Sequence, residues 1–281
     1  MDWHLIVPGA EELRGRDLSG AREVRLRPGQ PVWALLPEGI WQGRHILTPQ
    51  VVFAAAQALS GHELAARQRE MSQGFLPLPG GHRLGICGVT DGKSLREITS
   101  LCVRLCHEVP GAGSGIFPRL QDQNVLILGA PGTGKTTLLR DLIRLNGLHG
   151  RQVGVADERG EIAACRDGRP LLDVGPLCDV VTGLEKSSAV LLLIRAMAPD
   201  IIATDELGGP SDADALWEAR SCGALLLATA HGRSPREVLR RRGMEGLKEL
   251  FDRFVVLSAP GAPPEVIDPA KEAWPCTCSS P

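Results

Sequence analysis

The sequence lacks the features that identify several common classes of protein. It contains no tyrosine, and only 4% of its 281 residues are aromatic. Its 31 lysines and arginines nearly balance 33 acidic residues, so no strong overall charge favours nucleic acid or an anionic membrane. No apolar run approaches the roughly 18 residues of a membrane-spanning helix, and the longest, 189–194, ends at Arg195. We therefore expect a globular protein that does not span a membrane.

The eight cysteines form no C-x-x-C pair, so the spacing that is typical of zinc sites is missing. A reducing compartment suits scattered cysteines of this kind. Residues 1–8 lack the basic segment and the long apolar core of a signal peptide. These observations predict a cytoplasmic protein, at most peripheral to a membrane. The closely spaced Cys276 and Cys278 receive no role.

One stretch carries a specific signal for nucleotide binding. Residues 129–137 match the pattern G-x-x-x-x-G-K-[ST], after an apolar run and before a helical pattern. Glycines let backbone N–H groups surround phosphate oxygens, and the following helix adds its positive dipole end. Lys135 is expected to contact the β- and γ-phosphates of ATP, and the Thr136 hydroxyl to bind Mg²⁺. The predicted ATP-binding residues are Gly129, Ala130, Pro131, Gly132, Thr133, Gly134, Lys135, Thr136 and Thr137.

Acidic residues follow another apolar run, 201–204, at the place where a strand would end. In an open parallel sheet, ligands lie beyond the carboxyl ends of the strands. Asp205 is therefore predicted to hold Mg²⁺, and Glu206 to polarise the attacking water. Residues 201–206 thus supply the predicted metal ligand and one predicted catalytic base.

Two further strand ends carry polar groups that suit the same site. The predicted strand 153–156 is followed by an acidic stretch in which Glu158 and Glu161 are alternative catalytic residues. The predicted strand 224–230 ends at His231, which is suited to sensing the γ-phosphate. Whether Glu158, Glu161 or Glu206 is the main base stays open.

The order of the patterns predicts the fold. Strands and helices alternate after residue 117, which indicates a P-loop NTPase domain of RecA/AAA-like type, an α/β/α three-layer fold with a parallel sheet. Before it, short alternating runs and a helix start at Thr48-Pro49 predict a small α+β domain. His82 is expected to be a solvated residue at a hairpin tip. The expected division is 1–110 for the small domain, 111–116 for a Gly-rich flexible linker, 117–258 for the ATPase domain and 259–281 for a largely disordered, Pro/Gly-rich tail.

An arginine commonly stabilises the charge that develops during phosphoryl transfer. It often comes from a neighbouring subunit in ATPases that act as rings. The sequence does not rank its candidates, which are Arg159, Arg195 and Arg220 in the second domain and Arg96 and Arg104 in the first.

In this order, the motifs resemble those of known ATPases. Residues 198–208, 225–231 and 157–161 are similar to the acidic strand, the histidine box and the aspartate box of secretion and pilus-retraction ATPases. The chain resembles the stage III sporulation protein AA family more closely, from about residue 20 to about residue 258. The stretches that carry this resemblance are 23–27, 78–85, 136–141 and 157–163.

The resemblance to the sporulation family implies a function that the residues alone do not. It implies an Mg²⁺-dependent cytoplasmic ATPase in the mother cell of endospore-forming bacteria. Such a motor would energise the assembly of a secretion-like channel, or transport through it. The resemblance further implies a homo-oligomer, such as a hexameric ring, docked on membrane proteins of the channel.

Two other functions compete with an ATP-driven motor. A nucleotide-dependent switch with little turnover is one, although the guanine-reading N-K-x-D motif is missing because neither Asn124 nor Asn146 precedes a lysine. A nucleic-acid-associated ATPase is the other. The residues after 259 hold no basic patch interleaved with aromatic residues, so no direct nucleic-acid binding is expected.

Overall fold

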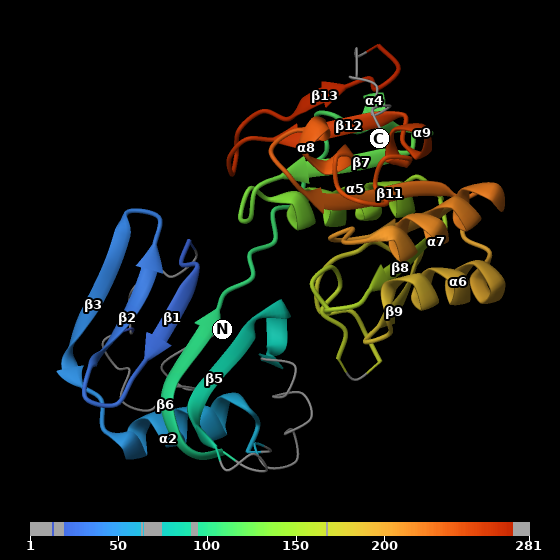
Figure 1. The fold of residues 1–281 in the computed structure, drawn as a ribbon. Coiled ribbons are helices and arrows are strands. Elements are labelled where there is room, and N and C mark those ends of the chain that lie inside the picture. The colour runs from blue at the N-terminus through green and yellow to red at the C-terminus, as the bar shows by residue number, and fades with distance from the viewer. Residues whose placement is uncertain are drawn as a thin grey trace, which may run out of the picture. The chain divides into compact units, whose positions relative to one another are not determined.

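The computed structural model describes residues 13, 20–62, 64, 75–90, 95–166 and 168–271. The chain divides into two compact units, Met1–His107 and Glu108–Pro281 (Figure 1). The division falls three residues before the predicted end of the small domain. The predictions for residues 1–8 and for Cys276 and Cys278 lie outside the described residues.

The first unit contains a six-stranded antiparallel sheet in the order β3-β2-β1-β6-β5-β4. Alternate residues of β1 and β2 are buried, as the period-two pattern predicts. Helix α2 begins where Thr48 caps it, with Thr48 Oγ1 accepting from Val51 N–H at 3.3 Å. The elements are β1 (Glu23–Leu26), β2 (Pro31–Leu36), β3 (Gly39–Ile46), α2 (Pro49–Leu59), β4 (Leu76–Pro77), η2 (Pro79–Gly81), β5 (Arg83–Thr90) and β6 (Leu95–Arg104).

The predicted hairpin at residues 75–87 is present, as β4 pairs with β5 through the turn at η2. His82 differs from its prediction as a solvated turn residue. Its Nδ1 accepts a hydrogen bond from Cys106 N–H at 2.9 Å. Burial lowers the pKa of His82, followed by nearby positive charge. This histidine therefore joins the hairpin to the end of β6.

The second unit contains a seven-stranded sheet in the order β13-β12-β7-β11-β10-β8-β9. Its strands run parallel except β13, which pairs antiparallel with β12. The strands are β7 (Val125–Gly129), β8 (Val153–Asp157), β9 (Cys178–Thr182), β10 (Ile201–Thr204), β11 (Leu225–His231), β12 (Arg253–Leu257) and β13 (Glu265–Ile267). The helices are α4 (Phe117–Leu120), α5 (Lys135–Leu148), α6 (Lys186–Met197), α7 (Pro210–Ser221), α8 (Pro235–Leu239) and α9 (Leu247–Leu250).

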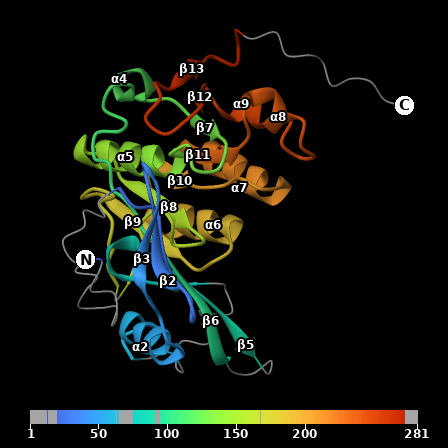
Figure 2. The same ribbon diagram turned by 90° about the vertical axis from the view of Figure 1, so that its left-hand side faces the viewer.

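Helices cover both faces of this sheet (Figure 2). Alternate residues of the central strands point to opposite faces, so Val125 and Ile127 pack with α5 while Leu126 and Leu128 pack with α6 and α7. The predicted three-layer α/β/α arrangement is therefore present. As a result, the carboxyl ends of β7, β11, β10 and β8 lie along one edge of the sheet.

Residues 111–116 of the predicted linker and residues 259–271 of the predicted tail have defined structure. Residues 111–116 form turns within the second unit, where Gly113 is buried against α5. The predicted disordered tail, 259–281, includes strand β13, in which Val266 pairs with Val255. Composition alone predicts flexibility in both segments, but the Asp141 side chain binds the N–H groups of Gly111 and Gly113, and backbone pairing with β12 holds β13.

Within the described part of the chain, we find no helix with both the length and the apolar character that crossing a bilayer requires.

Candidate functional site

The phosphate-binding loop connects β7 to α5. Gly132 and Gly134 have φ angles of 77° and 97°, in the left-handed region that glycine adopts without strain. Thr133 Oγ1 donates to Ala130 O at 2.9 Å, which closes the loop on itself. A Cβ on Gly129 would lie 2.4 Å from Thr133 Oγ1 and 2.9 Å from Leu257 O, so this position has no room for a side chain. The backbone conformation of the loop thus explains why the motif has glycine at these three positions.

Lys135 begins α5 and is buried against the loop that precedes it. Its Nζ donates to Gly129 O at 3.0 Å and to Ala130 O at 3.1 Å, and lies 3.1 Å from His231 Nδ1. Burial lowers the pKa of Lys135, while the charges of Glu206 and Glu161 act in the opposite direction. A cation held on backbone carbonyls can turn to phosphate oxygens without first breaking a strong ion pair.

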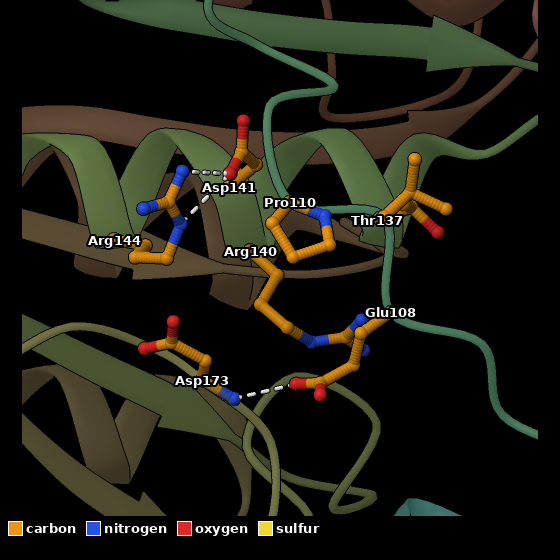
Figure 3. A pocket seen from close by; sticks show the side chains of 8 residues that line it. Glu108, Pro110, Thr137, Arg140, Asp141, Arg144 and Asp173 are labelled. Carbon is orange, nitrogen blue, oxygen red and sulfur yellow. Dashed lines mark hydrogen bonds and ion pairs between the residues drawn. The ribbon is translucent and has the colours of Figure 1, made fainter.

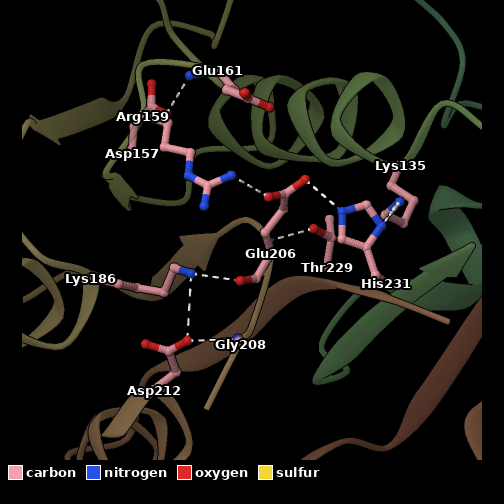
Figure 4. A network of polar contacts seen from close by, with 10 residues as sticks. All are labelled: Lys135, Asp157, Arg159, Glu161, Lys186, Glu206, Gly208, Asp212, Thr229 and His231. Atoms are coloured by element: carbon pink, nitrogen blue, oxygen red, sulfur yellow. Dashed lines mark hydrogen bonds and ion pairs between the residues drawn. The ribbon is translucent and has the colours of Figure 1, made fainter. Parts of the chain in front are cut away.

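Glu206 lies next to this lysine through His231 (Figure 4). Glu206 Oε1 is 2.8 Å from His231 Nε2, and Glu206 Oε2 accepts from Arg159 at 2.9 Å. His231 ends β11, which lies between β7 and β10 in the sheet, so its imidazole stands between Lys135 and Glu206. The structure therefore brings three of the predicted catalytic residues together.

The surroundings of Asp205 strongly shift the pKa of its carboxyl group. Its side chain is buried, and its Oδ2 atom has no hydrogen-bond partner. Burial raises the pKa of Asp205 to about 7, and the charges of Asp157 and Glu161 act in the same direction. A buried carboxylate oxygen without a partner is suited to a cation. The residues present therefore fit Mg²⁺.

Metal binding here would depend on the nucleotide. No group of three or more His, Cys, Asp or Glu side chains that could hold a metal ion occurs among the residues with described positions. Mg²⁺ is usually bound through one or two protein ligands together with phosphate oxygens and water. In such a site the Thr136 hydroxyl and the Asp205 carboxylate would be the two protein ligands.

The acidic stretch after β8 is a folded loop rather than a set of free carboxylates. Asp157 accepts hydrogen bonds from the N–H groups of Glu161, Ile162 and Ala163 at 2.7, 3.1 and 2.9 Å. Arg140 on α5 donates to the carbonyls of Ile162 and Glu161 at 2.6 and 2.8 Å. Glu161 acts on the pKa of both Lys135 and Asp205, whereas Glu158 is exposed. Of these two predicted alternatives, the geometry favours Glu161.

A second polar cluster lies beside α5, around a small pocket (Figure 3). Asp141 accepts from Gly111 N–H at 3.0 Å and from Gly113 N–H at 2.7 Å, and also pairs with Arg144 at 2.7 Å. Asp173 N–H donates to Glu108 Oε1 at 2.6 Å. These contacts fix residues 108–113, which explains the order of the predicted linker.

The arginine candidates lie in different places. Arg159 pairs with Glu206 of its own chain. Arg195 lies 3.9 Å from Glu218, and Arg220 donates to the carbonyl of Glu249. Arg96 and Arg104 belong to the first unit.

Sequence reasoning missed Lys186 and Asp212, which lie at the first turns of α6 and α7. Lys186 Nζ donates to Glu206 O at 2.8 Å and lies 3.6 Å from Asp212 Oδ2. Neither residue belongs to a recognised motif. The available signal was a lysine at the start of the largely apolar helix α6 and an aspartate in the first turn of α7.

The parallel sheet and the phosphate loop together define a P-loop fold, which solved ATPase structures share. The chain has a TM-score of 0.61 to the pilus retraction motor PilT, solved with bound ADP, at 15% identity over 94% of this chain and 81% of PilT. It has a TM-score of 0.59 to the Legionella pneumophila ATPase DotB, at 17% identity over 84% of this chain and 72% of DotB.

A more specific relationship is visible in the sequence. Residues 12–271 match the family described as "Sporulation stage III, protein AA". The chain is 34% identical over 261 residues to the stage III sporulation protein AA of Bacillus subtilis strain 168, covering 86% of this chain and 82% of that protein. The chain belongs to the sporulation stage III protein AA family, as its motifs predict.

Proposed function

We propose that this chain is an Mg²⁺-dependent ATPase that acts as a motor subunit. One observation carries the proposal. The phosphate loop, a partnerless buried carboxylate oxygen on Asp205 and the joined side chains of Lys135, His231 and Glu206 converge at one edge of the sheet. A phosphate-binding loop, a buried carboxylate oxygen without a partner and a candidate base at the same sheet edge are the groups that Mg²⁺-dependent hydrolysis of ATP needs.

Each side chain has a role in this proposal. Lys135 and the loop N–H groups bind the β- and γ-phosphates. Mg²⁺, held by Thr136 and Asp205, would neutralise charge on the phosphate oxygens. Glu206 orients the attacking water and accepts its proton, with Glu161 as the alternative base. His231 contacts both Lys135 and Glu206, so it is placed to report on the γ-phosphate.

The Glu206 carboxylate has two partners in the structure. Its two carboxylate oxygens are engaged by His231 and Arg159. Each oxygen keeps a further lone pair that can accept from water, and release of one partner on nucleotide binding would make Glu206 a stronger base. The exposed Arg159 partner, on a flexible side chain, is the weaker of the two restraints.

The cellular role that we propose follows from family membership. A motor of this family would energise the assembly of a secretion-like channel, or transport through it, during endospore formation. It would work in the mother-cell cytoplasm as a homo-oligomer, such as a hexameric ring, at the inner face of the membrane and in contact with membrane proteins of the channel.

Two substitutions test the proposed ATPase. Lys135→Ala should abolish ATP binding, because the loop loses its phosphate-binding cation. Glu206→Gln should bind ATP normally but lower turnover by about 10²-fold or more, in the range of general-base losses. Calorimetric titration and phosphate release measure the two effects.

The matched controls are Lys248→Ala and Glu245→Gln, because both side chains are exposed and lie on or near α9, outside the site. Both controls should behave as wild type. Wild-type turnover in Glu206→Gln would move the base to Glu161. Unchanged ATP affinity in Lys135→Ala would contradict the proposed binding site.

A further inference from the structure

Glu206 has an uncommon backbone conformation. Its φ angle is 47°, in the left-handed region that residues other than glycine rarely adopt. Such a conformation persists only where the surroundings hold it in place. The contacts around the backbone of residues 206–208 therefore determine where the Glu206 carboxylate points.

Two groups of contacts hold this backbone. On one side, Thr229 of β11 accepts from Glu206 N–H through its Oγ1 at 2.8 Å, and from Leu207 N–H through its carbonyl at 2.8 Å. On the other side, Lys186 donates to Glu206 O at 2.8 Å, and Asp212 accepts from Gly208 N–H at 2.8 Å (Figure 4). Each peptide group of the turn is thus tied to a neighbouring element.

Lys186 and Asp212 are themselves an ion pair, 3.6 Å apart, with side chains 7% and 12% exposed. A buried ion pair is weak evidence for stability, because apolar replacements of similar volume are often equally stable. The Lys186–Asp212 pair contacts the carbonyl of Glu206 and the N–H of Gly208, which are the backbone groups on either side of Leu207. The geometry of that turn, rather than the stability of the fold, is therefore what the pair specifies.

We propose that Lys186 and Asp212 are positioning residues, which fix the left-handed turn at residues 206–208 and so aim the Glu206 carboxylate at His231. This inference rests on the proposed function, because it concerns the geometry of the proposed base. The first turns of α6 and α7 would then position the proposed base at the carboxyl-end edge of the sheet.

The test uses a double substitution, Lys186→Met with Asp212→Asn, in the full chain. Methionine preserves the volume of the lysine, and asparagine can still accept from Gly208 N–H, so no unpaired charge remains buried. The contact that disappears is the one from Lys186 to Glu206 O. Hydrogen–deuterium exchange of the peptide that covers 205–209 and ATP turnover are measured beside melting temperature and ATP affinity.

The inference expects amide exchange in residues 206–208 to rise by about tenfold or more, and turnover to fall by about 10–100-fold, as displaced catalytic groups typically cause. ATP affinity should change by less than about threefold, because the phosphate loop is untouched. Lys186→Arg, which keeps a charged donor, should restore part of the turnover. Lys248→Met is the matched control and should resemble wild type.

A second pair of variants separates positioning from a general loss of structure. A glycine at position 206 adopts a positive φ without strain. In the Glu206→Gly background, the Lys186→Met/Asp212→Asn change should therefore raise amide exchange at residues 206–208 much less than it does in the wild-type background. If the double variant melts at too low a temperature, Lys186→Met alone is compared in the two backgrounds instead, because it removes the same contact with Glu206 O.

Three outcomes decide the question. Unchanged exchange at residues 206–208 would overturn the inference, and so would faster exchange with wild-type turnover. If the wild-type chain itself hydrolyses no ATP, the proposed function fails, and the exchange comparison between backgrounds still shows whether Lys186 fixes the turn.

Discussion

The ionised carboxylate of Asp205 destabilises the folded, nucleotide-free protein, because it is buried and one of its oxygens lacks a hydrogen-bond partner. Burial raises its pKa from 3.8 to about 7. A carboxyl group whose pKa is higher in the folded state favours folding while it is protonated. Its contribution is complete below about pH 4 and is lost as the pH rises through about 7. Mg²⁺ bound with nucleotide would offset this loss.

Asp205→Asn should therefore stabilise the nucleotide-free protein at pH 8 but have little effect at pH 4. At pH 8 we expect the free energy of unfolding to rise by on the order of 2–3 kcal/mol, because the amide has no charge to bury. The same variant should lose the additional stabilisation that Mg²⁺ gives in the presence of ATP. Thermal unfolding at the two pH values, with and without Mg-ATP, measures both effects.

Asp214→Asn on α7 serves as the control, because Asp214 is exposed and lies outside the site. It should change neither the pH dependence nor the response to Mg²⁺. An Asp205→Asn protein that is equally stable or less stable than wild type at pH 8 would contradict the buried-charge argument.

Helix α5 shows how one element serves two purposes. Its first residue is Lys135, at the phosphate loop, and nearly two turns further on Asp141 anchors residues 108–113. Burial works against ionisation of Asp141, but the N–H groups of Gly113 and Gly111, together with Arg144, hold its pKa below the ordinary value. Its contribution to stability is therefore present above about pH 4 and lost as the pH falls further.

Asp141→Ala should release the segment before α5 while sparing the site. Two backbone N–H groups lose their acceptor, so we expect the free energy of unfolding to fall by about 1–3 kcal/mol at pH 7. Exchange of the amides in residues 108–116 should increase, and limited proteolysis should cut there first. ATP affinity should stay near wild type. Loss of ATP binding without any change in residues 108–116 would refute this account of Asp141.

The elements differ in how far the sequence could predict them. The phosphate loop is predictable because its chemistry requires glycines, lysine and threonine at fixed spacing. Contacts such as His231 with Glu206 were not, because they depend on β11 inserting between β7 and β10, an order that no local pattern states. Lys186 was missed for the same reason, since its partner Glu206 lies twenty residues away.

The defined structure of residues 111–116 and of strand β13 was not predictable for a different reason. Composition alone indicated a flexible linker at 111–116 and a largely disordered tail after residue 258. The linker is held by Asp141, and Val266 pairs with Val255 across antiparallel strands. A glycine-rich segment loses its flexibility when a distant carboxylate binds its N–H groups, and local sequence gives no sign of that partner.

At the scale of the whole molecule, one chain contains the phosphate loop, the proposed metal ligand Asp205 and the proposed base Glu206. The arginine nearest to the base, Arg159, is paired with Glu206 of the same chain. In ring ATPases a further positive charge often comes from the neighbouring subunit, which makes turnover depend on assembly. The proposed motor would therefore be a weak ATPase as an isolated chain.

Light scattering after size-exclusion chromatography tests this dependence. The Glu206→Gln variant should bind ATP and hydrolyse it slowly, so with Mg-ATP it should hold the assembled state and elute as a homo-oligomer. Lys135→Ala should stay in the state of the nucleotide-free protein, because it lacks bound ATP. Turnover per wild-type chain should rise with protein concentration, because subunits associate by mass action.

Mixing wild-type and Lys135→Ala chains sharpens the test. If each site needs its neighbour only for an arginine, Lys135→Ala chains can still provide it, and turnover per wild-type chain should be preserved in mixed assemblies. If the subunits of the ring hydrolyse ATP one after another, a subunit without ATP should block its neighbours. Total turnover should then fall faster than the fraction of wild-type chains. A strict monomer in every nucleotide state, with turnover independent of concentration, would contradict the ring motor while leaving the ATP site intact.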